Sequence, residues 1–149
     1  MITEDNVRVF LDGANRFFRE ANKIDMEVGT PYLNENKNAI AYDYTGVISV
    51  SGPHRGIVYF TAPRILLRHL LVSIGEPDTS DAIMMDLTGE IANTISGNAR
   101  SEFGEEFDIS TPNVISGVPD EEQLPRTVRS FVIPLKWKNY QAAVVICLK

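Results

Sequence analysis

The chain has 149 residues and a formal net charge of -6, and 44% of its residues are hydrophobic. This length suits a single domain, 1–149, whose core is large enough to fold without a metal or a disulfide. The acidic excess argues against binding to nucleic acids or to anionic membrane surfaces, because both repel a negatively charged protein.

The chain is expected to be cytoplasmic. Residues Met1–Leu11 lack the apolar core of a signal peptide, and no apolar run approaches the roughly 20 residues that cross a bilayer. The single cysteine, Cys147, cannot form an internal disulfide, which agrees with a reducing compartment.

The first part of the chain predicts a helix followed by strands. Apolar residues recur at helical spacing from about Glu4 to Lys23, with Thr3 as the expected N-cap. A short strand is expected near Tyr32. Two longer strands, joined by a turn rich in Gly and Pro, are predicted at Ile40–Val50 and Ile57–Thr61.

Two central helices follow. The first is predicted over Ala62–Ile74, with Pro63 in its first turn and Gly75 just after its end. The second follows a capping segment at Asp78–Asp81 and extends from Asp81 to about Phe103.

The last part of the chain returns to strands. The segment Ile109–Ile115 contains Pro112, which is typical of an edge strand or of the start of a strand. Ser130–Trp137 and Tyr140–Leu148 predict a hairpin. The fold class expected is therefore α+β, a mainly antiparallel sheet with a long N-terminal helix and two central helices packed on one face.

The second central helix, DAIMMDLTGEIANTISGNARS from Asp81, has two distinct faces at about 100° per residue. The apolar face, expected to pack on the sheet, contains Ile83, Met84, Leu87, Ile91, Thr94 and Ile95. A polar stripe contains Asp86, Glu90, Asn93 and Gly97. Within this stripe, Glu90 and Asn93 are three residues apart and should lie side by side.

Two glycines, Gly89 and Gly97, lie inside this helix, where each costs roughly 1 kcal/mol relative to alanine. One explanation is close packing by a neighbouring helix of the same chain. The other is a partner protein that docks here and needs Glu90 and Asn93 unobstructed. The pattern alone favours the first explanation, because solvated Glu and Asn side chains are common on helix surfaces.

The polar stripe resembles a family signature. The motif Asp86-x-x-x-Glu90-x-x-Asn93, with Gly97 after it and Pro112 downstream, resembles the signature of the CheC/CheX/FliY chemotaxis phosphatase superfamily. The strings GEIANTISGNA and FDISTPNVISG are similar to CheX. The predicted elements also follow the order of this family over nearly the whole chain.

CheC-like members of the superfamily carry a second motif of the same kind. The first helix offers only Asp12-Gly13-Ala14-Asn15 and Glu20-Ala21-Asn22, and neither has the form ExxN. The resemblance is therefore to the single-site CheX arrangement.

The resemblance implies a phosphatase that acts on the aspartyl phosphate of a CheY-like response-regulator receiver domain. It assigns Asn93 to positioning the attacking water, Glu90 to pairing with the receiver's active-site lysine, and Asp86, Gly89 and Gly97 to partner binding. An amide suits the first task because it orients a water without titrating.

The resemblance further implies a homodimer with no cofactor of its own, whose reaction uses Mg²⁺ supplied by the receiver. The apolar strand Tyr140–Leu148 is expected to leave an open sheet edge that a second copy covers. No metal site is expected in the chain, because its two histidines, His54 and His69, lie in different predicted elements.

An alternative is a non-catalytic signalling or flagellar-switch module that binds a receiver or another partner, since the superfamily includes switch components. The intact Glu90 and Asn93 pair favours catalysis over docking alone. An enzyme of unrelated chemistry is disfavoured, because the sequence contains no P-loop, dinucleotide fingerprint, GxSxG motif or zinc-ligand spacing.

Overall fold

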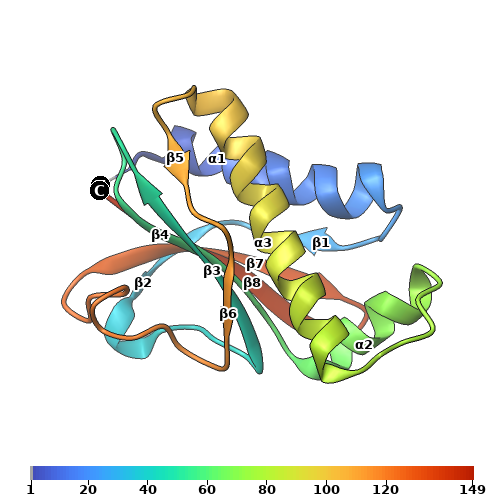
Figure 1. Cartoon of the computed structure of the whole chain (residues 1–149). Coiled ribbons are helices and arrows are strands. Elements are labelled where there is room, and N and C mark those ends of the chain that lie inside the picture. The colour runs from blue at the N-terminus through green and yellow to red at the C-terminus, as the bar shows by residue number, and fades with distance from the viewer. Residues whose placement is uncertain (1) are drawn as a thin grey trace.

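A computed structural model describes residues 2–149, which form one eight-stranded sheet and three α-helices (Figure 1). The strand order is β1-β7-β8-β4-β3-β5, β2 also pairs with β7, and β6 also pairs with β3. Every pairing is antiparallel. The strands are β1 (Glu27–Val28), β2 (Tyr32–Glu35), β3 (Tyr44–Ser51), β4 (Gly56–Ala62), β5 (Asp108–Ile109), β6 (Asn113–Ile115), β7 (Arg129–Trp137) and β8 (Tyr140–Leu148).

The first and the last helix begin where their capping residues predict, whereas the helix predicted from Ala62 begins at Arg64. Thr3 caps the first of them through its hydroxyl, which accepts a hydrogen bond from the Asn6 amide. Ser80 caps the last by accepting from the Ile83 amide. The helices are α1 (Glu4–Asn15), its π-helical continuation η1 (Arg16–Ala21), the 3-10 turn η2 (Asn36–Asn38), α2 (Arg64–Ser73) and α3 (Asp81–Phe103).

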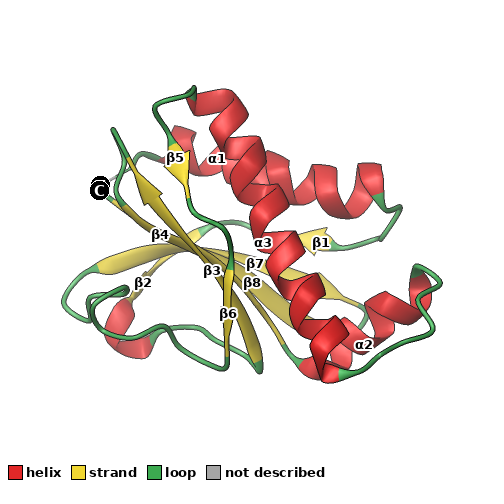
Figure 2. Cartoon of the chain, viewed as in Figure 1, coloured by secondary structure: helices red, strands yellow, loops and turns green. Residues whose placement is uncertain are grey.

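The central strands alternate between two cores, one on each face of the sheet. On one face, side chains such as Phe60 and Val144 pack with apolar residues of α1, α2 and α3 in a single cluster. On the other face, Tyr59 and Val145 lie beneath loop residues such as Leu124. The three helices thus cover one face of an antiparallel sheet, as expected (Figure 2).

The helix α3 lies unusually close to β3. A Cβ added to Gly46 of β3 would lie 2.8 Å from the backbone oxygen of Thr88 and 3.1 Å from the Cβ of Ala92. A side chain at this position would therefore overlap the helix. Gly13 allows a similarly close approach of α1 to α3, since a Cβ added to Gly13 would lie 3.2 Å from the backbone oxygen of Ile95.

Two predictions about the sheet are wrong. The strand expected to begin at Ile40 begins at Tyr44, because the residues before Tyr44 pack over the face of the sheet opposite the helices. There the Ile40 carbonyl accepts from the Tyr59 hydroxyl at 2.7 Å, and burial raises the pKa of Tyr59, which keeps this donor protonated. The second wrong prediction is that β8 forms an edge.

The strand β8 lies inside the sheet between β7 and β4, where Gly56 pairs with Leu148 and Trp137 with Tyr140. The outer strands are β1 and β2 on one side and β5 and β6 on the other. The homodimer remains a prediction, and any edge-to-edge pairing would have to use these outer strands. Among residues 2–149, no helix combines the length and apolar character that a bilayer crossing needs.

Replacing Gly46 with alanine should destabilise the protein by about 1–3 kcal/mol, because the added methyl would overlap the Thr88 carbonyl of α3. Urea unfolding measures this change. Ser49→Ala, at an exposed position of the same strand, is the control and should stay within about 0.5 kcal/mol of wild type. Unchanged stability of Gly46→Ala would contradict the close approach of α3 to β3.

Candidate functional site

The outward face of α3 carries the polar stripe expected from the sequence. Asp86, Glu90 and Asn93 are exposed and Gly97 is half-buried, whereas Leu87, Ile91 and Ile95 are buried against the sheet and α1. The structure therefore places all the predicted site residues on one helix.

The buried face of α3 is rotated relative to the predicted apolar face. Thr94, expected to pack on the sheet, is exposed, and Ile83 is only half-buried. Both residues lie at the border of the buried strip, next to Glu90 on the helical wheel. On its other side the buried strip extends over small residues that the prediction left out, including Thr88 and Ala92, where β3 approaches α3.

Glu90 and Asn93 are available to a partner. Across residues 2–149, neither side chain takes part in a hydrogen bond or an ion pair within the chain. A carboxylate and an amide that are exposed and unpaired can bind polar groups of another molecule without first breaking an internal contact.

The two glycines of α3 have different explanations. A Cβ at Gly89 would lie 3.2 Å from Cγ2 of Val114 and 3.5 Å from Cβ of Pro112. Gly89 is therefore buried by the strand segment that includes β6, and the neighbour is a strand rather than the helix considered from the sequence. A Cβ at Gly97 would have no neighbouring atom within 4 Å, so close packing within the chain does not explain this glycine.

The segment around Pro112 forms one border of the site. Pro112 lies between β5 and β6 and packs on α3 at Gly89, one residue before Glu90. Because proline has no backbone N–H, it interrupts the edge of the sheet here. The sequence pattern pointed to Pro112, but only the structure places it against the helix.

The N-terminus of α3 is fixed by a polar cluster that the sequence did not reveal. The Asp81 carboxylate accepts from the Tyr44 hydroxyl at 2.9 Å and pairs with Arg64 at 2.8 Å. The Arg64 amide donates to Asp43. The hydrogen bond to Asp81 raises the pKa of Tyr44, so the phenol stays protonated as the donor. These contacts join β3, α2 and α3.

The other half of α3 is fixed by α1. Arg16 donates to the Asn98 side-chain oxygen at 2.7 Å, and the Asn98 amide group donates to the Val9 carbonyl at 3.4 Å. Contacts at both halves of the helix thus hold its outward face in one orientation.

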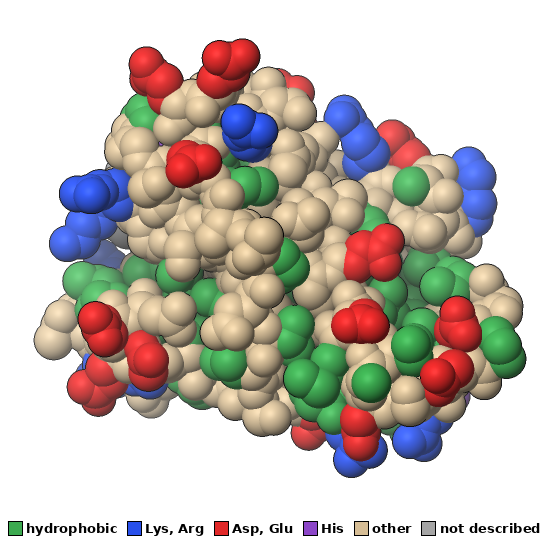
Figure 3. Space-filling model, in the orientation of Figure 1, with side chains coloured by type: hydrophobic (Ala, Val, Ile, Leu, Met, Phe, Trp, Pro, Cys, Tyr) green, Lys and Arg blue, Asp and Glu red, His purple; other side chains and the backbone are tan. Residues whose placement is uncertain are grey.

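Charge is distributed unevenly along this outward face. Figure 3 shows acidic side chains beside α3, an uncharged stretch beyond them, and one basic side chain over its C-terminal part with acidic side chains around it. Asp86 and Glu90 are the exposed acids in the middle of the helix, and Arg100 is the basic residue in its last turn.

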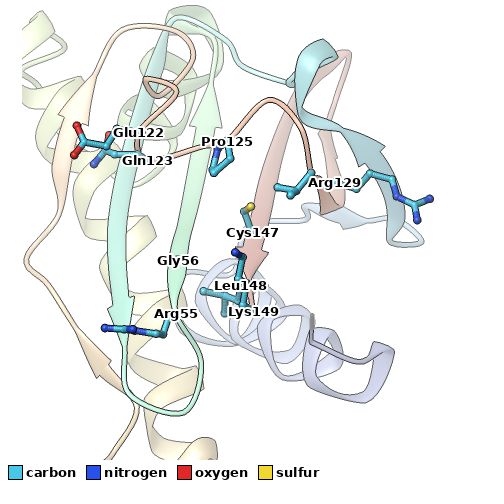
Figure 4. A pocket seen from close by; sticks show the side chains of 10 residues that line it. Arg55, Gly56, Glu122, Gln123, Pro125, Arg129, Cys147, Leu148 and Lys149 are labelled. Atoms are coloured by element: carbon cyan, nitrogen blue, oxygen red, sulfur yellow. The ribbon is translucent and has the colours of Figure 1, made fainter.

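A separate cavity of about 650 Å³ lies on the other face of the sheet, away from α3, beside Cys147, Leu148 and Pro125 (Figure 4). The side chains of Arg55 and Arg129 point away from one another rather than into a common site. Among residues 2–149, no group of three or more His, Cys, Asp or Glu residues could hold a metal ion. The exposed stripe of α3 is therefore the better candidate site.

The chain belongs to the CheX family, because the family model described as chemotaxis phosphatase CheX matches residues 44–136, more than half of its length. This range contains β3, α2, α3 and most of β7, and therefore the whole polar stripe. No curated protein sequence matches the chain significantly.

Solved structures share the fold over almost the entire chain. A CheC-like superfamily protein from Shewanella sp. PV-4 is 25% identical, with a TM-score of 0.82 and coverage of 99% of both chains. The chemotaxis protein CheX from Vibrio vulnificus is 23% identical, with a TM-score of 0.80 over 97% of this chain and 99% of that one. CheX in a CheX–CheY–BeF3–Mg²⁺ complex from Borrelia burgdorferi is 18% identical, with a TM-score of 0.74 and 99% coverage of both.

The different surroundings of the two glycines predict different effects of alanine. Gly97→Ala should stabilise the protein by about 1 kcal/mol, because alanine favours the helix and the new methyl meets no neighbour. Gly89→Ala should gain clearly less or lose stability, because its methyl would press on Val114. Urea unfolding of both variants tests this, and an equal gain in both would contradict the packing of Pro112 and Val114 on α3.

Proposed function

We propose that the protein is a phosphatase for the aspartyl phosphate of a CheY-like receiver domain. The observation that carries the proposal is that Glu90 and Asn93 lie exposed on the fixed outward face of α3. Within residues 2–149, neither side chain forms a hydrogen bond or an ion pair. Membership of the chemotaxis phosphatase family supports it, as does the solved complex of a similarly folded CheX with CheY, BeF3 and Mg²⁺.

In the proposed reaction, Asn93 holds a water in line with the phosphorus–oxygen bond of the aspartyl phosphate. The water oxygen bonds to phosphorus while the bond to the aspartate oxygen breaks, which releases the receiver carboxylate and inorganic phosphate. Both protons of the water leave with the inorganic phosphate, which is released as dihydrogen phosphate. Phosphoryl transfer of this kind depends mainly on positioning and charge stabilisation, and a neutral amide can approach the phosphoryl oxygens without repulsion.

Glu90 has a separate role in the proposal. Its carboxylate pairs with the receiver's active-site lysine in a charge-assisted contact that sets the register of docking. Asp86 lies one turn earlier on the same exposed face and extends this contact. Gly97 leaves room for close approach of the partner, while the buried Gly89 acts through the placement of Pro112.

In the proposed reaction the Mg²⁺ ion is bound by the receiver domain. The receiver supplies Mg²⁺ to neutralise the phosphoryl oxygens, and this chain contributes the water-positioning amide. The cytoplasm is the proposed location, because response regulators carry signals inside the cell.

Asn93→Ala should reduce stimulated dephosphorylation by at least a hundredfold and leave binding to the phosphorylated receiver nearly unchanged, because it removes the group that positions water. Glu90→Ala should lose activity through weaker docking. One lost charge-assisted contact is worth about 1.5–3 kcal/mol, or roughly ten- to a hundredfold in affinity. Phosphate release and a binding titration separate the two effects.

Both variants should remain folded, since Glu90 and Asn93 are exposed and alanine favours helix. Leu87→Ala is the contrasting control, because Leu87 is buried and its truncation should cost about 2–5 kcal/mol of stability. Wild-type phosphate release by Asn93→Ala would exclude the catalytic role and favour a docking module.

Removal of Mg²⁺ with excess chelator should abolish the stimulated release of phosphate, because the receiver-bound ion neutralises the transferred group. The fold of this chain should be unaffected by the same treatment, which circular dichroism can check. Undiminished turnover in chelator would contradict the assignment of the metal to the receiver.

A further inference from the structure

The outward face of α3 continues beyond Asn93 into a hollow of about 340 Å³ that lies between the end of α3 and β5. The hollow is lined by Gly97, Arg100, Ser101, Gly104, Glu105 and Ile109. Its floor is open because a Cβ at Gly97 or at Gly104 would meet no atom within 4 Å. The hollow therefore adjoins the proposed catalytic surface along the same helix.

Arg100 is the basic group at this end of the surface. It is exposed, and across residues 2–149 it forms no ion pair and donates no side-chain hydrogen bond. It is the only Lys or Arg within α3. The acids of the polar stripe, Asp86 and Glu90, lie nearer the N-terminus, whereas the exposed Glu102 lies on the opposite side of the helical wheel from Asn93. The polar stripe thus carries acids at Asp86 and Glu90 and a base at Arg100.

The spacing of these charges has a consequence for docking. Arg100 is seven residues after Asn93, which on an α-helix is about 10 Å along the axis and nearly the same angular position. Glu90 and Asn93 lie within one turn of α3, so contacts at these two residues constrain the direction of the partner along the helix only over a short distance. Two opposite charges fix one direction, since the reversed pose brings like charges together.

We infer that Arg100 and the Gly97 hollow form a second docking subsite, which takes an acidic side chain on the receiver surface about 10 Å from its phosphorylated aspartate. This inference rests on the proposed function, because it takes the receiver as the partner. Glu105 on the same rim repels a misplaced acid and so narrows the position that the partner's carboxylate can occupy. Arg100 is a specificity-determining residue in this arrangement and takes no part in the chemistry.

The test is steady-state phosphate release at varied concentrations of a phosphorylated CheY-type receiver. Arg100→Gln should raise KM by about two- to fivefold, as expected for an exposed ion pair, and Arg100→Glu should raise it further. The value of kcat should stay within about twofold of wild type, because Asn93 is untouched. High salt should narrow the difference in KM between wild type and both variants.

Arg68→Glu is the matched control. Arg68 is exposed on α2, in a hollow beside Trp137 and Lys138, and its reversal changes the net charge by the same amount. Its KM should equal that of wild type. Thermal unfolding of Arg100→Gln should match wild type closely, so that a rise in KM cannot be assigned to loss of folding.

A charge exchange gives the sharpest result. Replacing the receiver's acid with lysine should restore a low KM to Arg100→Glu and raise the KM of wild type, which a purely structural role of Arg100 would not produce. An unchanged KM for Arg100→Glu, with Asn93→Ala inactive, would overturn the docking subsite and leave the proposed function intact. An altered light-scattering mass of Arg100→Glu with unchanged KM would also overturn it, by assigning the residue to contact between two copies.

If wild type releases no phosphate above the receiver's own rate, the proposed function fails. The subsite is then tested by titration of a CheY-type receiver in the presence of beryllium fluoride and Mg²⁺. A weaker affinity of Arg100→Glu than of Arg68→Glu would support the subsite as part of a docking module. Equal affinities, or no binding by wild type, would overturn it.

Discussion

The close contact between α3 and its surroundings is the constraint on which the site depends. Gly46 allows β3 to approach within van der Waals distance of Thr88 and Ala92, and Gly89 allows Pro112 and Val114 to lie directly on the helix. Protein interiors that are packed as closely as this are stiff. The outward face of α3 is therefore held in place partly by this close packing.

The polar contacts at both halves of α3 complement this packing. Asp81 is joined to Tyr44 and Arg64, and Asn98 is joined to Arg16. A reaction that depends on positioning gains from such a support, because small displacements of a water-orienting group reduce the rate strongly. Within residues 2–149, the side chains of Glu90 and Asn93 form no hydrogen bond or ion pair, so the contacts that fix the helix do not involve these two groups.

The exposed stripe also explains why a docking module and a phosphatase are difficult to distinguish by fold alone. Both need an accessible, fixed helix face, and solved structures with the same fold include a CheC-like protein, CheX and a CheX–CheY complex. The difference lies in single side chains. The amide at position 93 can orient water without titrating, and the carboxylate at position 90 can pair with a cation of the partner.

The sequence by itself determined the elements and the residues of the stripe. Helical and strand periodicities located α1, α2, α3 and the β7–β8 hairpin, because these patterns reflect which faces must be buried. The spacing of Glu90 and Asn93 placed them side by side for the same reason. Thr3 and the capping segment Asp78–Asp81, in which Ser80 accepts the hydrogen bond, marked the starts of α1 and α3 through purely local contacts.

Only the tertiary structure decided what depends on contacts between distant residues. In the structure β8 lies in the interior of the sheet and not at its edge, and Thr94 is exposed. Packing within the chain explains the glycine at position 89 but not the glycine at position 97. The contacts among Tyr44, Arg64 and Asp81 join residues from three elements, and no local sequence pattern predicts contacts between such distant residues. Strand order and close approach are set by long-range packing, which a periodicity along one element cannot encode.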